Sequence, residues 1–191
     1  LAKDKTAKNG KWVKGPGMSL IKALKPICEG KLIIAEDLGD ITPEVEKLVK
    51  DSGYPGMRVL QFGFLDGDES SHMPHNYIEN CVAYTGTHDN NTLLGFAWDL
   101  DYESKKRVFE YFGYYGNDTD ESLDYMIRSL FASHAGIVIV PVQDLLGYGA
   151  DTRMNKPGVA SGNWSYRVKK EQLDEIDRGK YKYLNDIYWR K

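Results

Sequence analysis

Carboxylates, amides and a histidine follow short apolar runs of this chain. Glu36 comes directly after the run at 32–35, and His88 and Asp89 follow the run at 81–84 within a few residues. A pair of carboxylates with different environments can divide proton transfer and charge stabilisation between them. Carboxylates and amides also match the hydroxyls of a sugar as acceptors and donors. The pattern indicates an enzyme site, and a polyhydroxylated ligand suits its residue types.

The same residues also have a structural interpretation. Adjacent acids such as Glu36 and Asp37 often stand as solvated charges in loops that approach helices. Asp89 or Asn90 could cap a helix through an Asx-type turn. At the level of single residues, both interpretations remain open.

Two further histidines do not form a metal motif. Pro74 separates His72 from His75, and no Cys or acid completes a ligand set around them. We therefore expect no metal and no other cofactor.

Four apolar runs predict the strands that position the candidate residues. Uninterrupted runs of this kind are typical of strands buried on both faces, which occur in parallel sheets. The expected strands are 32–35, 59–62, 81–84 and 137–142, and the expected helices are 18–24, 43–52, 102–112 and 121–134. This alternation predicts an α/β fold in which reactive groups gather at the carboxyl ends of the strands. Four strands make either a small open sheet or half of an eight-stranded barrel.

Composition excludes several classes of partner. The 191 residues carry a formal charge of −3, which gives no general attraction to nucleic acid or to an anionic membrane. No apolar stretch is long enough to span a bilayer. Only two cysteines occur, Cys28 and Cys81, and we expect them to be reduced thiols of a cytoplasmic protein. The 13 tyrosines and 4 tryptophans serve either core packing or platforms for a flat ligand such as a sugar ring.

Taken together, the motifs resemble one family, the 4-α-glucanotransferases, also called amylomaltases or disproportionating enzymes, which are relatives of the α-amylases. The matching segments are 33-IIAEDLGDITPEV-45, 53-GYPGMRVLQFGF-64, 74-PHNY-77, 84-YTGTHDNNT-92, 141-PVQDLLG-147, 153-RMNKPG-158 and 162-GNWSYR-167. The resemblance implies a (β/α)₈ barrel of the α-amylase type. It also implies transfer of α-1,4-glucan segments to the 4-hydroxyl of another glucan or of glucose, by a retaining double displacement through a covalent glycosyl-enzyme. The implied partners are maltooligosaccharides and starch or glycogen dextrins.

The resemblance also implies roles for single residues. Glu36 matches the general acid/base on the fifth strand of the barrel. Asp89 matches the carboxylate that holds sugar hydroxyls and stabilises an oxocarbenium-like transition state. The implied substrate contacts are His88, Asp66, Asn155 and Pro157.

One departure from the family pattern decides what the chain can do. The family's nucleophile is an aspartate in an arginine-X-aspartate-histidine motif, and these 191 residues contain no such motif. We therefore expect residues 1–191 to be the C-terminal part of the barrel domain, about strands five to eight, with 1–11 as an exposed connection and 171–191 as a tail helix. We expect the isolated chain to be inactive. The alternatives are a non-catalytic glucan-binding half-barrel and an amylase-type hydrolase. Because a half-barrel exposes two sheet edges, we also expect self-association, or an edge covered by the tail.

Overall fold

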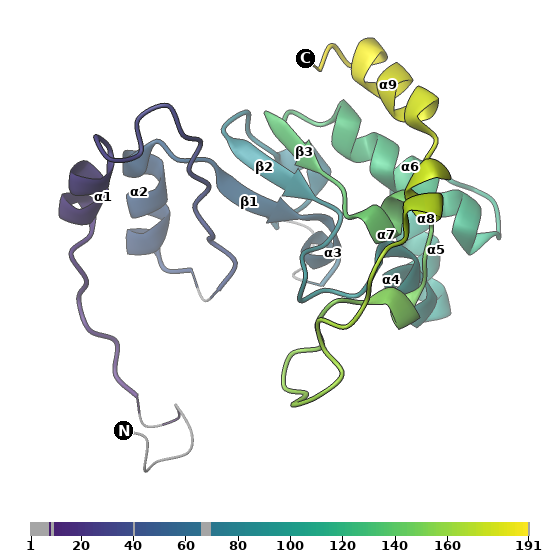
Figure 1. Cartoon of the computed structure of the whole chain (residues 1–191), viewed down its shortest axis with the longest axis horizontal. Helices are drawn as coiled ribbons and strands as arrows, with labels where there is room; N and C mark the ends of the chain where they lie inside the picture. Colours follow the sequence, from purple (N-terminus) through teal and green to yellow (C-terminus); the bar gives the residue numbers. More distant parts are fainter. Residues whose placement is uncertain (1–7, 9, 40, 66–69, 191) are drawn as a thin grey trace. The chain divides into compact units, whose positions relative to one another are not determined.

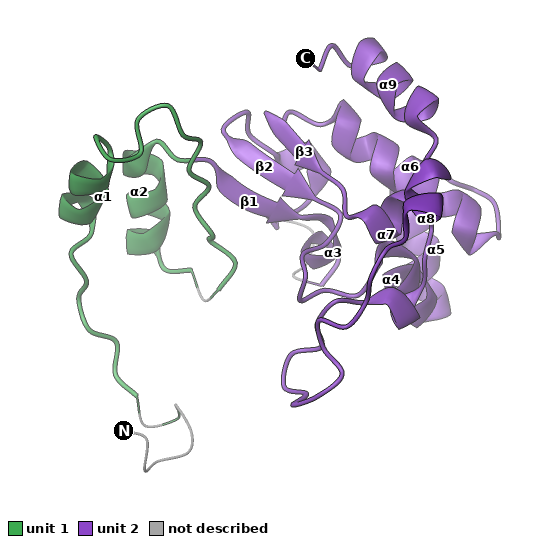
Figure 2. Ribbon diagram, in the orientation of Figure 1, with its two compact units in different colours: residues 1–54 green, residues 55–191 purple. Residues whose placement is uncertain are grey.

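The computed structural model describes residues 8, 10–39, 41–65 and 70–190 (Figure 1). The chain forms two compact units, residues 1–54 and residues 55–191 (Figure 2). Within the described ranges, no helix has the length and apolar character needed to cross a membrane. Neither Cys28 nor Cys81 forms a disulfide.

In its described residues, the first unit contains two helices, α1 (Met18–Leu24) and α2 (Pro43–Ser52), and both confirm the sequence prediction. Helix α2 begins at a proline, whose fixed φ suits the first helical position. It ends at Gly53, which adopts a left-handed φ of 73° that favours glycine. The turn chemistry of the sequence therefore fixes both ends of this helix.

The strand expected over 32–35 is not formed. Within the described part of the first unit, this run has a single bridging residue, Ala35, in place of a ladder. Leu32 is 62% exposed, so the run lacks the two-sided burial of a central parallel strand. Glu36 follows the bridging residue and is exposed.

The second unit is built around a parallel three-stranded sheet. Its strands are β1 (Gly56–Val59), β2 (Cys81–Tyr84) and β3 (Ile137–Ile139). They lie in the order β1-β2-β3, and β2 has the predicted bounds. Tyr84 stands opposite Val59 on one side and opposite Ile139 on the other. The carboxyl ends of the three strands are therefore level, and the loops that follow them leave from one edge.

Two of the predicted strands have different bounds. Strand β1 lies three residues earlier than 59–62, and Leu60 already begins the short helix α3 (Leu60–Gly63). The N–H of Val59 donates to Nδ1 of His72 at 3.0 Å. Similarly, the run 137–142 contains β3, two residues outside any helix or strand and the first residue of α7 (Val142–Leu145). The described sheet therefore has three strands, where the sequence predicted four.

Several helices complete the second unit. They are α4 (Leu93–Asp99), α5 (Tyr102–Tyr111), α6 (Thr119–Ala132), α8 (Lys170–Asp174) and α9 (Arg178–Ile187), with single 3₁₀ turns at Pro74–Asn76 and Ala150–Thr152. The sequence predicted α5 and α6 but missed α4. Helix α4 starts after Thr92, whose hydroxyl accepts a hydrogen bond from the N–H of Gly95 at 3.1 Å. The N-cap is thus Thr92, and neither Asp89 nor Asn90 has that role.

Helices pack against one face of the sheet, and the other face carries the candidate site. Cys81 and Ala83 join a buried core with residues of α4, α5 and α6. Because side chains alternate along a strand, Tyr84 points to the opposite face, where it lines a cavity. The helical layer provides a buried apolar core, and the opposite face remains available for chemistry.

The tail forms two helices, and the second of them packs against α6. Leu184 is 4% exposed and belongs to the core, and Ile187 packs against it. The Arg190 guanidinium donates to four carbonyls at the end of α6, with N–O distances of 2.7–3.2 Å. These carbonyls belong to Leu130, Phe131, Ser133 and Ala135. A cation at this position also interacts favourably with the negative, C-terminal end of the helix dipole.

We predict that Arg190→Ala lowers the free energy of unfolding of the chain by about 2 kcal/mol, because hydrogen bonds from a charged donor each contribute roughly 1.5–3 kcal/mol and Arg190 is only partly buried. Arg190→Lys should lose about half as much, since one ammonium cannot reach all four carbonyls. Urea denaturation measures both effects. Lys182→Ala is the matched control, because Lys182 is exposed on α9, close in sequence to Arg190, and pairs with Asp186. Equal stabilities of Arg190→Ala and the control would contradict this account of the tail.

Candidate functional site

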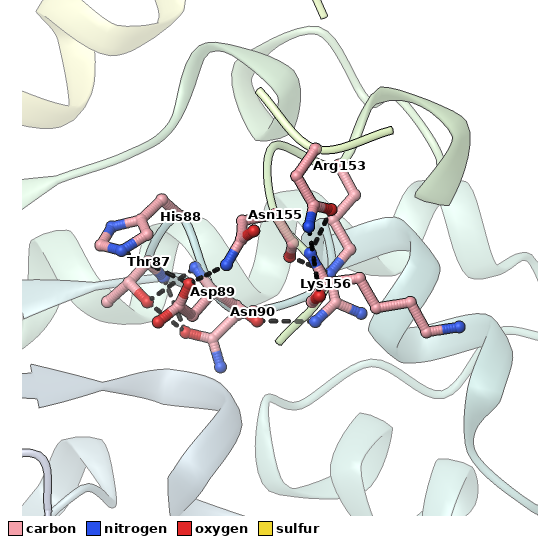
Figure 3. Close-up of polar contacts among 8 residues, drawn as sticks. Thr87, His88, Asp89, Asn90, Arg153, Asn155 and Lys156 are labelled. Atoms are coloured by element: carbon pink, nitrogen blue, oxygen red, sulfur yellow. Dashed lines mark hydrogen bonds and ion pairs between the residues drawn. The ribbon is translucent and has the colours of Figure 1, made fainter. Parts of the chain in front are cut away.

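The loop after β2 presents His88 and Asp89 at its tip. Thr87 closes the loop by donating its N–H and its hydroxyl to Oδ1 of Asn90, both at 2.8 Å. The side chains of His88 and Asp89 remain about half exposed, at 54% and 51%. Both lie in this loop beside Thr87 and Asn90 (Figure 3). This short turn therefore holds an imidazole and a carboxylate side by side, facing solvent at the carboxyl end of the sheet.

A second loop, which follows β3 and α7, contacts Asp89. The side-chain amide of Asn155 donates to Oδ1 of Asp89 at 2.5 Å. Nε2 of His88 lies 3.4 Å from the same oxygen. The structure therefore brings together three residues that the sequence analysis named, although 66 positions separate Asn155 from Asp89.

Arg153 ties the two loops together through main-chain carbonyls. Its Nη2 donates to the carbonyl of Asp89 at 2.6 Å, and its Nε donates to the carbonyl of Asn155 at 2.8 Å. The N–H of Asn155 donates in turn to the carbonyl of His88 at 3.1 Å. The sequence motifs indicate no role for Arg153. Its motif position was the only available signal, because contacts with main-chain carbonyls leave no pattern of residue types.

Trp164 lies beside His88. Their ring centroids are 5.1 Å apart at an interplanar angle of 37°, and Trp164 is 51% exposed. Its main chain has a φ of 61°, in the left-handed region, which costs a non-glycine residue on the order of 1 kcal/mol. The N–H of Trp164 donates to the carbonyl of Met154 at 2.7 Å and holds this conformation. The rings of His88 and Trp164 thus form an exposed aromatic surface, and His88 lies next to the carboxylate of Asp89. An exposed surface of this kind suits a platform for a sugar ring better than a role in core packing.

A cavity of about 390 Å³ opens on this face of the sheet, a size suited to a small-molecule ligand. The strands contribute Met57, Tyr84 and Ile139 to its lining, and the loops contribute Gly86, Thr87, His88, Asn90, Asn91, Thr92, Pro141, Gln143, Asp144, Arg153 and Met154. Its floor is thus largely apolar and its rim is rich in hydroxyls and amides. Such a lining is able to orient a polyhydroxylated ligand.

Asp144 anchors the base of the site. The side chain is 3% exposed and accepts hydrogen bonds from the hydroxyl of Thr85 and, at 2.7 Å, from the N–H of Leu93. Burial raises the pKa of Asp144 to about 6, although both hydrogen bonds act in the opposite direction. Through these two hydrogen bonds, the carboxylate links helix α7 to the residue after β2 and to the start of α4.

We predict a pH-dependent stability that comes from Asp144. Its pKa rises from 3.8 to about 6 on folding, so the stabilising contribution is complete below pH 4 and is lost as the pH rises through 6. Two pKa units correspond to about 3 kcal/mol. Asp144→Asn should therefore remove most of the fall in unfolding free energy between pH 4.5 and pH 7.5, as measured by urea denaturation. Asp186→Asn, at an exposed carboxylate, is the control. A fall as steep in Asp144→Asn as in the original chain would refute this assignment.

The remaining sequence-predicted residues are not part of this cluster. Asp66 lies outside the described residues. Pro157 is exposed two residues after Asn155. Glu36 belongs to the other compact unit. That Glu36 and Asp89 act at one site therefore stays a prediction.

Two of the histidines outside the cluster, His72 and His75, have structural partners. Nδ1 of His72 accepts the N–H of Val59, and Nδ1 of His75 lies 2.8 Å from the hydroxyl of Tyr111. In the part of the chain that the structure describes, no three His, Cys, Asp or Glu residues are grouped so that they could hold a metal ion.

The comparisons with known proteins agree with one another. The family model described as 4-alpha-glucanotransferase matches residues 1–173. The chain is 40% identical over 191 residues to the 4-alpha-glucanotransferase of Synechocystis sp. This match covers 98% of this chain and 37% of that protein. It is 41% identical over 189 residues to the 4-alpha-glucanotransferase of Clostridium butyricum, covering 98% of this chain and 38% of that protein.

A solved structure gives the same result for the fold. An amylomaltase from Streptococcus agalactiae, solved in complex with acarbose, matches with a TM-score of 0.88 and 38% sequence identity. The match covers 97% of this chain and 37% of that chain. This chain thus spans less than two-fifths of the length of the relatives that it matches. Over that span, sequence and fold agree, and the chain belongs to the 4-alpha-glucanotransferase family.

Proposed function

We propose that this chain is a catalytic segment of an enzyme that transfers α-1,4-glucan segments from a donor glucan to an acceptor glucan or to glucose. The observation that carries the proposal is the meeting of His88, Asp89 and Asn155 beyond the carboxyl ends of parallel strands, where His88 also lines a cavity. Family membership supports the reaction class. The aromatic surface of His88 and Trp164 supports a sugar as the ligand.

In this proposal, Asp89 binds sugar hydroxyls at the cleavage site. Its carboxylate stabilises the positive charge that develops on the ring as the glycosidic bond breaks. Oδ1 is occupied by the amide of Asn155, which leaves the second oxygen for the substrate. His88 contributes a further hydrogen bond to the same sugar.

Glu36 acts as the general acid and base. It protonates the leaving glycosidic oxygen while a carboxylate nucleophile forms a bond to the anomeric carbon. It then takes the proton from the 4-hydroxyl of the acceptor, which displaces that nucleophile. Retaining enzymes need the two carboxyl groups roughly 5–5.5 Å apart. Because the 191 residues hold no arginine-X-aspartate-histidine motif, the nucleophile belongs to a segment outside them.

We further propose that β1, β2 and β3 are the sixth, seventh and eighth strands of a (β/α)₈ barrel. Two features support this placement. The strands are parallel and follow one another in chain order, and helices of the second unit pack against one face of the sheet. As outer strands of the described sheet, β1 and β3 have edges suited to pairing, and we propose that the isolated chain self-associates through them.

The product pattern from maltotriose tests the proposed reaction. The suitable protein is the parent enzyme, by which we mean the complete protein encoded by the reading frame that contains these residues. Transfer produces glucose together with longer dextrins at a constant number of reducing ends. Hydrolysis produces only shorter sugars and raises the number of reducing ends. Chromatography combined with a reducing-end assay separates the two, and a pattern of hydrolysis alone would reject the proposal.

A further inference from the structure

We propose that the segment 153–164 is a clamp that positions the carboxylate of Asp89, with Arg153 and Asn155 as its positioning residues. The inference rests on the catalytic role proposed above for Asp89. It assigns to Asn155 an action through Asp89, where the sequence resemblance implied a contact with the glucan. It also gives Arg153 a role that no pattern in the sequence indicates.

The first element of the clamp is the hydrogen bond from the Asn155 amide to Oδ1 of Asp89. At 2.5 Å the contact is short, and hydrogen bonds to a carboxylate are roughly twice as strong as those between neutral groups. The Asp89 side chain is about half exposed, so packing alone does not fix its rotamer. The amide of Asn155 therefore selects the orientation in which the second carboxylate oxygen is available to a sugar (Figure 3).

The second element is the guanidinium of Arg153, which sets the distance between the two loops. One planar group donates to the carbonyl of Asp89 and to the carbonyl of Asn155, so it holds the main chain on both sides of the side-chain contact. The hydrogen bond from the N–H of Asn155 to the carbonyl of His88 adds a direct link. A rigid fork of donors suits this task, and the single ammonium of lysine does not reproduce it.

The third element is Trp164, which braces the neighbouring histidine. Its ring contacts His88, and its N–H bonds to the carbonyl of Met154, within the same segment. The left-handed main chain at a tryptophan is a local strain, and such strain persists where surrounding contacts over-determine the conformation. His88 and Asp89 are thus both held by one segment.

Such a clamp affects the transition state more than substrate binding. Electrostatic stabilisation of developing charge depends on groups that are already oriented, and small displacements of them cost up to about 100-fold in rate. A freely rotating Asp89 still binds glucan through other contacts, but it does not hold its oxygen where charge develops. Loss of the clamp should therefore lower kcat and leave KM nearly unchanged.

A double-mutant cycle in the parent enzyme tests the coupling. We expect Asn155→Ala to lower kcat for maltotriose disproportionation by about 10–100-fold, with a change in KM below about threefold. In an Asp89→Asn background, the same substitution should have no further effect, because Asn155 acts through Asp89. Arg153→Ala should behave in the same way, with partial rescue by Arg153→Lys. Lys156→Ala serves as the control, because the Lys156 side chain is exposed and the hydrogen bonds of this residue to Asn163 come from its main chain.

Two results would overturn the proposal. One is an equal loss from Asn155→Ala with and without the carboxylate of Asp89, which would mean that Asn155 acts independently. The other is a rise in KM at constant kcat, which would make Asn155 an ordinary substrate contact.

Amide hydrogen exchange of the 191-residue chain provides a readout that does not need activity. Arg153→Ala should speed exchange of the Asn155 N–H at least tenfold, whereas Lys156→Ala should not. If the parent enzyme shows no transfer, the proposed function fails, and this exchange measurement still decides on the clamp. Unchanged protection of the Asn155 N–H in Arg153→Ala would then reject it.

Discussion

The 191-residue chain alone is expected to disproportionate maltotriose at a rate on the order of 10⁶ below that of the parent enzyme, by analogy with the loss of a nucleophile from a hydrolase triad. Glu36 is able to donate a proton, and Asp89 is able to stabilise positive charge. On the family pattern, neither attacks the anomeric carbon from the opposite face of the ring. Without a covalent intermediate, the double displacement has no first step. Chromatography of long incubations with maltotriose measures the residual rate.

A positive control for that assay is the parent enzyme at matched molar concentration. Circular dichroism of the isolated chain should show the helices that the structure describes, so that inactivity is not mistaken for unfolding. A turnover close to that of the parent would place the nucleophile within these residues and would make the assignment of Glu36 and Asp89 wrong.

Glu36→Gln in the parent enzyme is the substitution with the next largest expected effect. Glutamine keeps the size and hydrogen-bonding ability of the side chain but neither donates nor accepts the transferred proton. General acid–base catalysis contributes about 10²–10⁴-fold, so transfer from maltotriose should fall by that factor. Binding of maltoheptaose, measured by calorimetry, should change less than threefold, because glutamine retains the neutral contacts.

A donor with a better leaving group separates the chemical role of Glu36 from a structural one. Fluoride leaves without protonation, so α-maltosyl fluoride should recover much of the first step in Glu36→Gln. Glu29→Gln, at an exposed glutamate of the same unit, should behave like the unaltered enzyme. If the fluoride donor reacts as slowly as maltotriose, the proton transfer belongs to another residue.

The elements that the sequence predicted well are those whose ends carry local signals. Helix α2 begins at a Thr-Pro pair and ends at a left-handed glycine, and these signals need no knowledge of the rest of the chain. Helices α5 and α6 begin after aspartates that cap them, Asp101 and Asp118, and each has apolar residues on one side. Local capping and periodicity therefore account for these elements.

The errors occurred where burial or distant partners decide the structure. Helix α4 is buried from Leu93 to Ala97, so it has no polar face that would reveal a helical period. The run at 32–35 has the composition of a strand, but a ladder depends on partners that lie far away in the sequence. The run at 59–62 was assigned the wrong type, because short apolar runs fit a helix and a strand equally well.

The candidate site was predictable in part. The sequence resemblance named His88, Asp89 and Asn155, and the structure brings these three together. It did not assign the role of Arg153, whose acceptors are carbonyls that every residue possesses. The raised pKa of Asp144 was likewise hidden, because it results from burial next to Thr85 and Leu93, which lie 59 and 51 positions away in the sequence.

The strand order β1-β2-β3 has a consequence for how the molecule is made. Each strand pairs with the one that precedes it in the chain, so a polypeptide that leaves the ribosome from its N-terminus can add every strand to an edge already in place. The loop that carries His88 and Asp89 emerges with the second strand, whereas Arg153 and Asn155 follow the third. The three strands can therefore pair first. The contacts of Arg153 and Asn155 with the Asp89 loop form only after synthesis has passed the last strand.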